Sequence, residues 1–340
     1  MIEVGHATSL VAGPAPRRPA AAPATREGGP SVTTTTRRGR WTAADVPDQR
    51  GRTALVTGAN SGLGLHTSLG LARRGARVLM ACRDPARGGA ALDRVRSEVP
   101  GAAVELVRLD LASLASVRAA AVEVAGRVDR LDLLVDNAGV MAVPFSRTED
   151  GFERQLGTNH LGHFALTGLV LPLLLASPAP RVVVVSSGAH RAGRIAFDDL
   201  QSERSYRRWG AYAQSKLANL LFARELDRRS AATPLVVAAA HPGYAATSLQ
   251  RGQGSPLLEA AMRVGNLLVA QSDAAGAWPS LYAATMPDVQ RGDYWGPGLA
   301  EVRGTPKRVG RSPAATDDVV AWRLWEVSEQ LTGVTYDLPA

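Results

Sequence analysis

The sequence is poor in two residue types, and each scarcity limits what the protein can be. It contains one cysteine, Cys82, so an intrachain disulfide is excluded and nothing points to an oxidising compartment. Lysine is almost as rare, because only Lys216 and Lys307 stand among 39 basic residues. Arginine fills the other basic positions, which raises the question of what Lys216 does that arginine would not do.

The sequence also lacks a long hydrophobic run. Its longest apolar stretch, LTGLVLPLLLA at residues 166–176, is too short to span a bilayer and is interrupted by Pro172. No signal-peptide core occurs near the N-terminus. The sequence therefore predicts a soluble, cytoplasmic protein without a membrane partner.

The first 40 residues differ in composition from the rest of the chain. They are rich in Ala, Pro, Thr, Gly and Arg and show no apolar periodicity, so we expect a disordered leader over residues 1–40. The formal net charge of +8 is spread along the chain and forms no basic stripe interleaved with aromatic residues. A nucleic-acid partner is therefore not expected.

From residue 51 onward, short apolar runs alternate with segments of helical length. The predicted strands occupy residues 53–57, 77–81, 103–110, 131–135, 181–186 and 234–240. Uniformly apolar strands joined by helices are typical of a parallel sheet with right-handed crossovers. We predict a single α/β domain over 51–340, a Rossmann-type doubly wound parallel sheet with helices on both faces. Residues 250–310 are the least regular part and are expected to cover a substrate.

The turn TGANSGLG, residues 57–64, lies between the first predicted strand and the first predicted helix. Gly58, Gly62 and Gly64 permit a tight turn and a close approach of a pyrophosphate to the start of the helix. Glycine-rich turns also occur for reasons of backbone geometry alone, and the spacing here differs from the general dinucleotide fingerprint. The place of the turn after the first strand favours dinucleotide binding.

The end of the second predicted strand bears on the choice of cofactor. An NAD enzyme usually places a carboxylate there for the ribose hydroxyls, but this chain has Cys82 followed by Arg83. A cation suits a 2′-phosphate, so NADP is the expected cofactor and NAD is kept as the alternative. Arg83 could equally be a surface residue of an arginine-rich protein, and Asp84 could weaken the preference. Cys82 is expected to be a small buried residue near the adenosine.

Tyr212 and Lys216 stand four residues apart in a predicted helix, so their side chains share one face. A phenol has an ordinary pKa of about 10, and a nearby ammonium lowers it toward the range useful for proton transfer. Lysine is compact and has three donors, whereas the planar fork of arginine is not an equivalent replacement. A chance pairing on one helix face is the alternative interpretation.

Six motifs together resemble the short-chain dehydrogenase/reductase family and occur in the order found there. They are TGANSGLG, DNAG (136–139), TNHLGHFAL (158–166), VVVVSSGAH (182–190), YAQSK (212–216) and HPGYAAT (241–247). The long insert between Ser187 and Tyr212 resembles the retinol-dehydrogenase-like branch, close to protochlorophyllide reductases. The chain resembles a soluble member of bacterial type, so the retinoid substrate is not carried over.

The resemblance implies a catalytic tetrad. Tyr212 would exchange the proton with the carbonyl oxygen, and Ser187 would hydrogen-bond that oxygen as charge develops on it. Lys216 would hold the nicotinamide ribose and lower the pKa of Tyr212. Asn159 would complete the set by supporting a water chain to Lys216. Ser186 is the rival for the serine role.

The resemblance also implies the surroundings of the cofactor. Asp110 and Leu111 would border the adenine, and Thr247 would touch the nicotinamide amide or the phosphates. Asp136 departs from the asparagine that the family usually has. The histidines, including His160 and His163, show no metal-ligand spacing, so no metal is expected. The expected cofactor-binding residues are Gly58, Asn60, Ser61, Gly62, Leu63, Gly64, Arg83, Asp110, Leu111, Asn137, Ala138, Gly139, Tyr212, Lys216, Pro242, Gly243 and Thr247.

The predicted function is therefore NADP-dependent interconversion of a carbonyl (ketone or aldehyde) and an alcohol. Two alternatives stay open, an NADP-binding sensor or scaffold without turnover, and an NADPH-dependent reductase of C=C bonds. The expected partner is a small, partly hydrophobic carbonyl or alcohol substrate. By the resemblance, a homodimer or homotetramer is expected through the helices after Asn159 and Tyr212.

Overall fold

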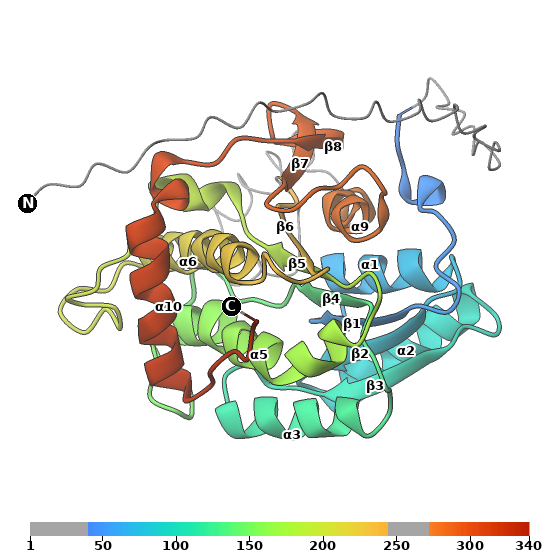
Figure 1. Ribbon diagram of the computed structural model, residues 1–340, viewed down its shortest axis with the longest axis horizontal. Coiled ribbons are helices and arrows are strands. Elements are labelled where there is room, and N and C mark those ends of the chain that lie inside the picture. Colours follow the sequence, from blue (N-terminus) through green and yellow to red (C-terminus); the bar gives the residue numbers. More distant parts are fainter. Residues whose placement is uncertain (1–39, 244–271, 340) are drawn as a thin grey trace, which may run out of the picture. The chain divides into compact units, whose positions relative to one another are not determined.

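The computed structural model describes residues 40–243 and 272–339, which belong to one compact unit, Arg40–Ala340 (Figure 1). The leader predicted over 1–40 lies outside the described residues apart from Arg40. The unit begins before residue 51, the predicted start of the domain. Val46 is buried, and Trp41 packs edge-on against Tyr282 with ring centroids 5.2 Å apart.

An eight-stranded sheet forms the centre of the described unit, in the order β3-β2-β1-β4-β5-β6-β7-β8. All neighbouring strands are parallel except the last pair, β7 and β8. The predicted doubly wound parallel sheet is confirmed, and each of the six predicted strands is present. The strands are β1 (Thr53–Thr57), β2 (Arg77–Cys82), β3 (Val104–Arg108), β4 (Leu133–Asp136), β5 (Arg181–Val185), β6 (Val236–Ala240), β7 (Tyr294–Leu299) and β8 (Arg303–Arg308).

Helices cover both faces of the sheet because alternate strand residues point to opposite sides. In β5, Val182 and Val184 join a core with α3 (Leu114–Ala125), α5 (Gly162–Leu175), α6 (Arg208–Arg229) and α10 (Asp318–Thr332). Val183 and Val185 join the opposite core with α1 (Gly62–Ala72), α2 (Pro85–Glu98) and α9 (Trp278–Thr285). Shorter helical segments are η1 (Ala43–Asp45), α4 (Arg154–Leu156), η2 (Gly157–Leu161), η3 (Gly188–Ala192), α8 (Asp273–Gly276) and η5 (Pro313–Thr316).

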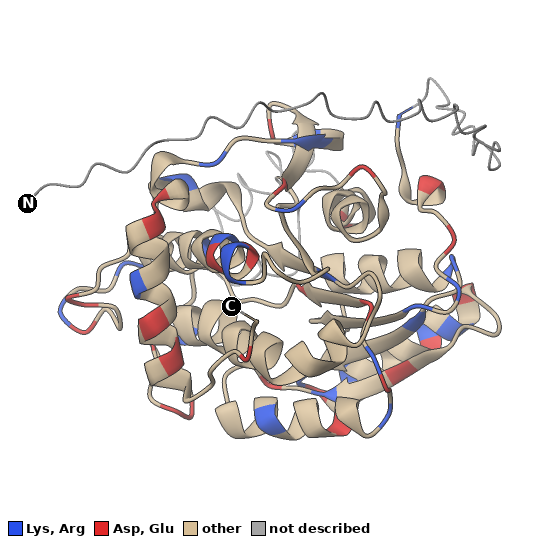
Figure 2. Ribbon diagram, in the orientation of Figure 1, with Lys and Arg blue, Asp and Glu red and all other residues tan. Residues whose placement is uncertain are grey.

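One helical stretch, Arg154–Leu175, is long and apolar enough to cross a membrane, with a mean hydropathy of 1.2 over its most apolar window. It comprises α4, η2 and α5. The fold explains its composition, because 72% of that window is buried inside the unit. The ribbon of α5 carries no charged residue, whereas α2 and α10 carry both signs (Figure 2). The stretch serves here as a core helix.

Residues 250–310, the least regular part of the sequence pattern, contain regular elements where the structure describes them, and their role in covering a substrate stays a prediction. Residues 244–271 lie outside the described residues, but the remainder contains α8, α9 and the β7–β8 hairpin. Pro297 and Pro306 face each other across this hairpin, beside a register shift. Because proline and glycine are disfavoured inside strands, their presence in YWGPGL and RGTPKR hid both strands from a propensity argument.

Candidate active site

Two adjoining cavities, of about 340 and 650 Å³, lie at the carboxyl ends of the parallel strands. Ligands of doubly wound sheets bind at this edge. We call them the first and second cavity. The two are continuous, because four residues line both of them: Leu63, Asn137, Gly139 and Val140.

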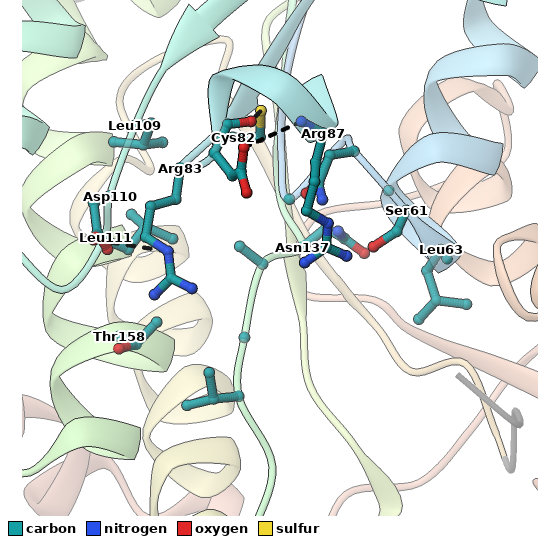
Figure 3. Close-up of a pocket in the computed structure, with 18 residues that line it drawn as sticks. Ser61, Leu63, Cys82, Arg83, Arg87, Leu109, Asp110, Leu111, Asn137 and Thr158 are labelled. Atoms are coloured by element: carbon teal, nitrogen blue, oxygen red, sulfur yellow. Dashed lines mark hydrogen bonds and ion pairs between the residues drawn. The ribbon is translucent and has the colours of Figure 1, made fainter. Parts of the chain in front are cut away.

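The first cavity collects most of the predicted cofactor residues from four separate strand ends (Figure 3). The predicted residues that line it are Gly58, Asn60, Ser61, Gly62, Leu63, Gly64, Arg83, Asp110, Leu111, Asn137, Ala138 and Gly139. Sequence reasoning did not list Arg87, Val140 and Thr158, which also line it. Arg87 lies in the first turn of α2, and no local feature of the sequence distinguished it from the other arginines of that helix.

The β1–α1 turn is shaped for a ligand that comes close to the backbone. Gly58 has a φ of +66°, and a Cβ on Gly64 would lie 2.3 Å from the carbonyl oxygen of Gly58. Ser61 starts α1 without a side-chain capping bond, so it leaves the first-turn amides to other acceptors. The buried Oδ1 of Asn137 has no hydrogen-bond partner among the described residues. These features fit a dinucleotide with its pyrophosphate at the start of α1.

Two arginines and two aspartates line the first cavity, namely Arg83, Arg87, Asp84 and Asp110. The side chains of Arg83 and Arg87 extend in the same direction from the β2–α2 junction (Figure 3). Arg83 lies 4.0 Å from Asp110 and is mostly exposed. Asp84 accepts from the backbone N–H groups of Ala86 and Arg87 and so caps α2. Its carboxylate has a structural task, which weakens the idea that it offsets a preference for a 2′-phosphate.

Cys82 lines the same cavity, as expected for a residue near the adenosine. It is buried, and its Sγ lies 3.4 Å from the carbonyl oxygen of Asp84. Burial raises the pKa of the Cys82 thiol, so the thiol is protonated at neutral pH.

The second cavity brings together Ser187, Tyr212, Lys216, Pro242 and Gly243. The Ser187 hydroxyl is hydrogen-bonded to Tyr212, and the Lys216 ammonium lies 5.9 Å from the centre of the Tyr212 ring. Lys216 also donates to the carbonyl oxygen of Val185 at 3.2 Å. Three of the four residues that the resemblance implied as a catalytic tetrad, Ser187, Tyr212 and Lys216, therefore line one cavity. Thr247 lies outside the described residues.

The rival serine is oriented differently. The Ser186 hydroxyl donates to the backbone carbonyl of Lys216 at 2.7 Å and is almost fully buried. Ser187 also accepts from the N–H of Ala189, which holds its side chain at the start of η3. Of the two serines, Ser187 is the one whose side chain interacts with Tyr212, and its catalytic role stays a prediction.

The expected direction of the Tyr212 pKa is wrong for this structure. Burial raises the pKa of the phenol above its ordinary value, and the hydrogen bond with Ser187 opposes that rise. Lys216 is buried as well, and its own pKa falls to about 8. Sequence spacing revealed the proximity of the two groups but not their burial, which disfavours the charged form of each.

Asn159 supports the site from behind and lines neither cavity. It lies in the π-helical segment η2, a geometry that is frequent at functional sites. Its side chain accepts from the N–H of Val140 at 2.8 Å and donates to the carbonyl of Val140 at 2.9 Å. It also donates to Ser215, whose hydroxyl donates to the backbone carbonyl of Tyr212. Ser215, which spacing did not single out, therefore joins Asn159 to the helix that carries Tyr212.

His163 links η2 to the end of β1. One ring nitrogen lies 3.0 Å from the carbonyl oxygen of Asn159, and the other lies 2.8 Å from the hydroxyl of Thr57. The Thr57 hydroxyl accepts from the N–H groups of Asn137 and Ala138, both at 2.9 Å. Burial lowers the pKa of His163 to about 4, so the ring is neutral. His163 therefore connects the segment of Asn159 to the end of β1 beside the first cavity, which is a structural role.

Asp136 is fully buried at the end of β4. Its Oδ2 accepts from the hydroxyl of Thr167 at 3.0 Å, whereas its Oδ1 has no partner among the described residues. Burial raises the pKa of Asp136 to about 8. The carboxyl is therefore mostly neutral at pH 7. A neutral carboxyl has the same shape as the side-chain amide of the asparagine expected at this position from the family resemblance.

Comparison with known proteins agrees with this geometry. Residues 52–256 match the family model of the short chain dehydrogenases. The chain belongs to this family. Retinol dehydrogenase 14 of Mus musculus is 45% identical over 299 residues, which cover 84% of this chain and 86% of that protein. This short-chain dehydrogenase is therefore an oxidoreductase of a family that binds NAD(P) and acts on small molecules.

Solved structures share the fold of this short-chain dehydrogenase. An uncharacterized protein from Mycobacterium paratuberculosis is 46% identical, with a TM-score of 0.73 over 88% of this chain and 100% of its own. The RhlG/NADP active-site complex of Pseudomonas aeruginosa is 25% identical, with a TM-score of 0.59 over 73% of this chain and 94% of its own. The second of these contains NADP.

Proposed function

We propose that this short-chain dehydrogenase interconverts a carbonyl compound and an alcohol with NADP(H), and that Tyr212 exchanges the proton. The observation that carries the proposal is the position of Tyr212 beside Ser187 and Lys216 in a cavity continuous with the first cavity. A relative that is 45% identical is named as a dehydrogenase of an alcohol, retinol, which supports the reaction class.

The bound nicotinamide would supply the hydride in reduction and accept it in oxidation. Burial keeps the Tyr212 phenol protonated at neutral pH, so it can donate to a carbonyl oxygen that becomes negative. The Ser187 hydroxyl, which is already in contact with Tyr212, would hydrogen-bond the same oxygen. Lys216 would be the compact cation beside the ribose and the phenol. The hydrogen bonds from Asn159 to Ser215 and from Ser215 to the carbonyl of Tyr212 connect η2 to the helix that carries Tyr212.

The preference for NADP is supported by charge. Arg83 and Arg87 both line the adenosine end of the first cavity, and Asp84 is engaged in capping α2. A carboxylate from Asp110 is present 4.0 Å from Arg83, but it lies after β3 and not at the end of β2. Two guanidinium groups fit a phosphate dianion better than they fit ribose hydroxyls alone. The NADP complex of the Pseudomonas aeruginosa relative gives further support.

The proton role is tested with Tyr212→Phe, assayed on a carbonyl compound that the unchanged protein reduces. Loss of a general acid costs about 10²–10⁴-fold in rate, so kcat should fall by this factor while NADPH still binds. Tyr282→Phe is the matched control, because Tyr282 bonds Asp288 and lines neither cavity. Near-full turnover by the Tyr212 variant would overturn the assignment. Product analysis distinguishes the alcohol from a product reduced at a C=C bond.

Cofactor preference is tested by titrating NADPH and NADH into Arg83→Ala, Arg87→Ala and the double variant. Each charge-assisted contact is worth about 1.5–3 kcal/mol, so the Kd of NADPH should rise by about tenfold or more per arginine and that of NADH much less. Arg94→Ala is the control, because Arg94 pairs with Glu98 on α2 and lines neither cavity. Equal losses for both nucleotides would remove the argument from the 2′-phosphate.

A further inference from the structure

The turn between β7 and β8 reaches the second cavity in an unfavourable backbone conformation. Ala300, Glu301 and Val302 line the cavity, and the N–H of Val302 donates to the carbonyl oxygen of Leu299 at 2.9 Å. Ala300 has a φ of +49° and Glu301 a φ of +58°. Two-residue hairpin turns of this kind favour Asn-Gly, and left-handed backbone costs about 1–2 kcal/mol per residue elsewhere. Such strain persists only where its surroundings impose it.

Arg191 holds this turn in place. Its Nη2 lies 2.8 Å from each carboxylate oxygen of Glu301 and donates to the carbonyl oxygen of Gly310 at 3.0 Å. Arg191 lies in η3, the segment that begins after Ser187, and it also lines the second cavity. The ion pair therefore places one positive and one negative group on the wall of the cavity that contains Tyr212.

His241 adds a buried donor at the same wall. Its Nδ1 accepts from the N–H of Gly243 at 3.1 Å, which assigns the ring hydrogen to Nε2. That Nε2 lies 3.4 Å from Glu301 but has no hydrogen bond of good geometry among the described residues, although the side chain is only 1% exposed. Gly296 abuts the ring, because a Cβ there would lie 2.1 Å from Nε2. Burial lowers the pKa of His241 to about 4, so the ring is uncharged.

The charges of this group sum to zero, and this determines what it can bind. A hydroxyl can accept from Arg191 and donate to Glu301, so it satisfies groups of both kinds. A carboxylate would meet the carboxylate of Glu301 at close range, which is unfavourable. An alkyl group would cover polar atoms without replacing their hydrogen bonds with water.

The other walls of the second cavity are largely apolar. They include Leu63, Val140, Met141, Val185 and Trp209. A substrate that fills the cavity therefore meets an apolar surface over most of its length and a polar group at the β7–β8 turn. This contrast orients a molecule that has a polar end of its own.

We infer that Arg191, Glu301 and His241 form a specificity-determining end of the substrate cavity, which selects carbonyl or alcohol substrates that carry a second, uncharged hydrogen-bonding group such as a hydroxyl. The inference rests on the proposed carbonyl–alcohol reaction, because it describes the substrate of the same site. It assigns to three residues from separate segments a task that the Ser187–Tyr212–Lys216 set does not perform.

The experiment measures kcat/KM at saturating NADPH for three aldehydes that differ only at the far end. They are 4-(hydroxymethyl)benzaldehyde, 4-ethylbenzaldehyde and 4-formylbenzoate, together with the matching biphenyl series, which reaches further along the cavity. The unchanged protein should prefer the hydroxymethyl compound of at least one series. It should exceed the ethyl compound by about fivefold and the carboxylate by about tenfold or more, since each 1.4 kcal/mol gives a factor of ten.

Two variants change the charge of the group in opposite directions. Glu301→Gln keeps the size of the side chain and leaves Arg191 without its counter-charge, so the carboxylate-to-ethyl ratio should rise by about tenfold. Arg191→Met leaves Glu301 uncompensated, so the same ratio should fall. Glu203→Gln is the matched control, because Glu203 pairs with Arg147 at 2.7 Å and lines neither cavity. Thermal unfolding verifies that each variant is folded.

The outcomes distinguish failure of the inferred specificity group from failure of the proposed carbonyl–alcohol reaction. Opposite shifts of the ratio in the Glu301 and Arg191 variants, with no shift in the Glu203 control, support the inference. Reduction of the ethyl compounds with the same ratios in all four proteins overturns the inference and leaves the proposed function intact. If the unchanged protein reduces none of the six compounds although NADPH binds, the proposed function fails, and the inference fails with it.

Discussion

The β1–α1 turn of the first cavity is shaped by its backbone, whereas the wall of the second cavity at the β7–β8 turn is formed by side chains from distant segments. Gly64 packs directly against the backbone carbonyl of Gly58 in the β1–α1 turn. The Thr57 hydroxyl accepts from two backbone N–H groups that follow β4. Arg191 and Glu301, by contrast, are 110 residues apart and meet only at the hairpin. A cofactor shared by a whole family can be held by backbone geometry, while a particular substrate needs particular side chains.

Among the substitutions that compare the two cavities, the largest effect is expected from adding one methyl group to the first cavity, with Gly64→Ala. The new Cβ would lie 2.3 Å from the carbonyl oxygen of Gly58, so the turn must open. We expect the Kd of NADPH to rise by about a hundredfold, equivalent to about 3 kcal/mol, in a fluorescence titration. Gly89→Ala is the control, since a Cβ at Gly89 meets nothing within 4 Å. Unchanged affinity would show that the turn does not frame the cofactor.

The same methyl group placed behind His241, at the wall of the second cavity, should affect catalysis and spare the cofactor. In Gly296→Ala the Cβ would lie 2.1 Å from His241 Nε2, so the ring must move from the wall beside Glu301. We expect kcat/KM for the hydroxymethyl aldehyde to fall by about tenfold while the Kd of NADPH changes by less than about threefold. An equal loss in kcat/KM and in the affinity for NADPH would contradict the prediction that this wall affects the substrate and not the cofactor.

Asp136 provides a comparison outside both cavities, because it is buried at the end of β4 and lines neither of them. Its pKa is about 8 in the folded protein and 3.8 ordinarily. The folded state binds the proton more tightly, so the stability from this group is complete below pH 3.8 and is lost as pH rises toward 8. Asp136→Asn should remove this dependence. Its stability relative to the unchanged protein should be about 3–4 kcal/mol more favourable at pH 8 than at pH 5, measured by denaturant unfolding.

The result that would contradict this prediction is a stability difference that does not change with pH. Such a result would mean that Asp136 stays ionised in the folded protein. Because Thr167 donates to one oxygen only, an ionised Asp136 would then need a further partner from water or from the residues that are not described.

The smallest expected effect is at Trp209, an exposed aromatic side chain on the apolar side of the second cavity. It is 58% exposed, and its ring centre lies 6.0 Å from that of Tyr212. An aromatic contact contributes about 0.5–1.5 kcal/mol, so Trp209→Ala should raise the KM for the biphenyl aldehydes by several-fold and the KM for acetaldehyde much less. Equal changes for both would show that Trp209 does not contact the aromatic part of a substrate.

Much of the fold could be predicted because its signals are local. The strands β1 to β6 are mostly short runs rich in apolar residues, and glycines mark the first turn. The hairpin β7–β8 was missed because its prolines and glycines argue against a strand, and only pairing with β6 makes it one. Arg87 and Ser215 were missed because nothing in their local sequence distinguishes them from other helical residues.

By itself the sequence determined the order of the strands along the chain, the glycine-rich turn at residues 57–64 and the spacing of Tyr212 and Lys216. These depend on periodicity and on residues close together in the chain. Only the tertiary structure decided that Ser187 and not Ser186 meets Tyr212. It also decided that burial raises the pKa of the phenol, and that Arg191 and Glu301 meet at the cavity wall. Burial and long-range contacts depend on how the whole chain packs, and no short stretch of sequence encodes that packing.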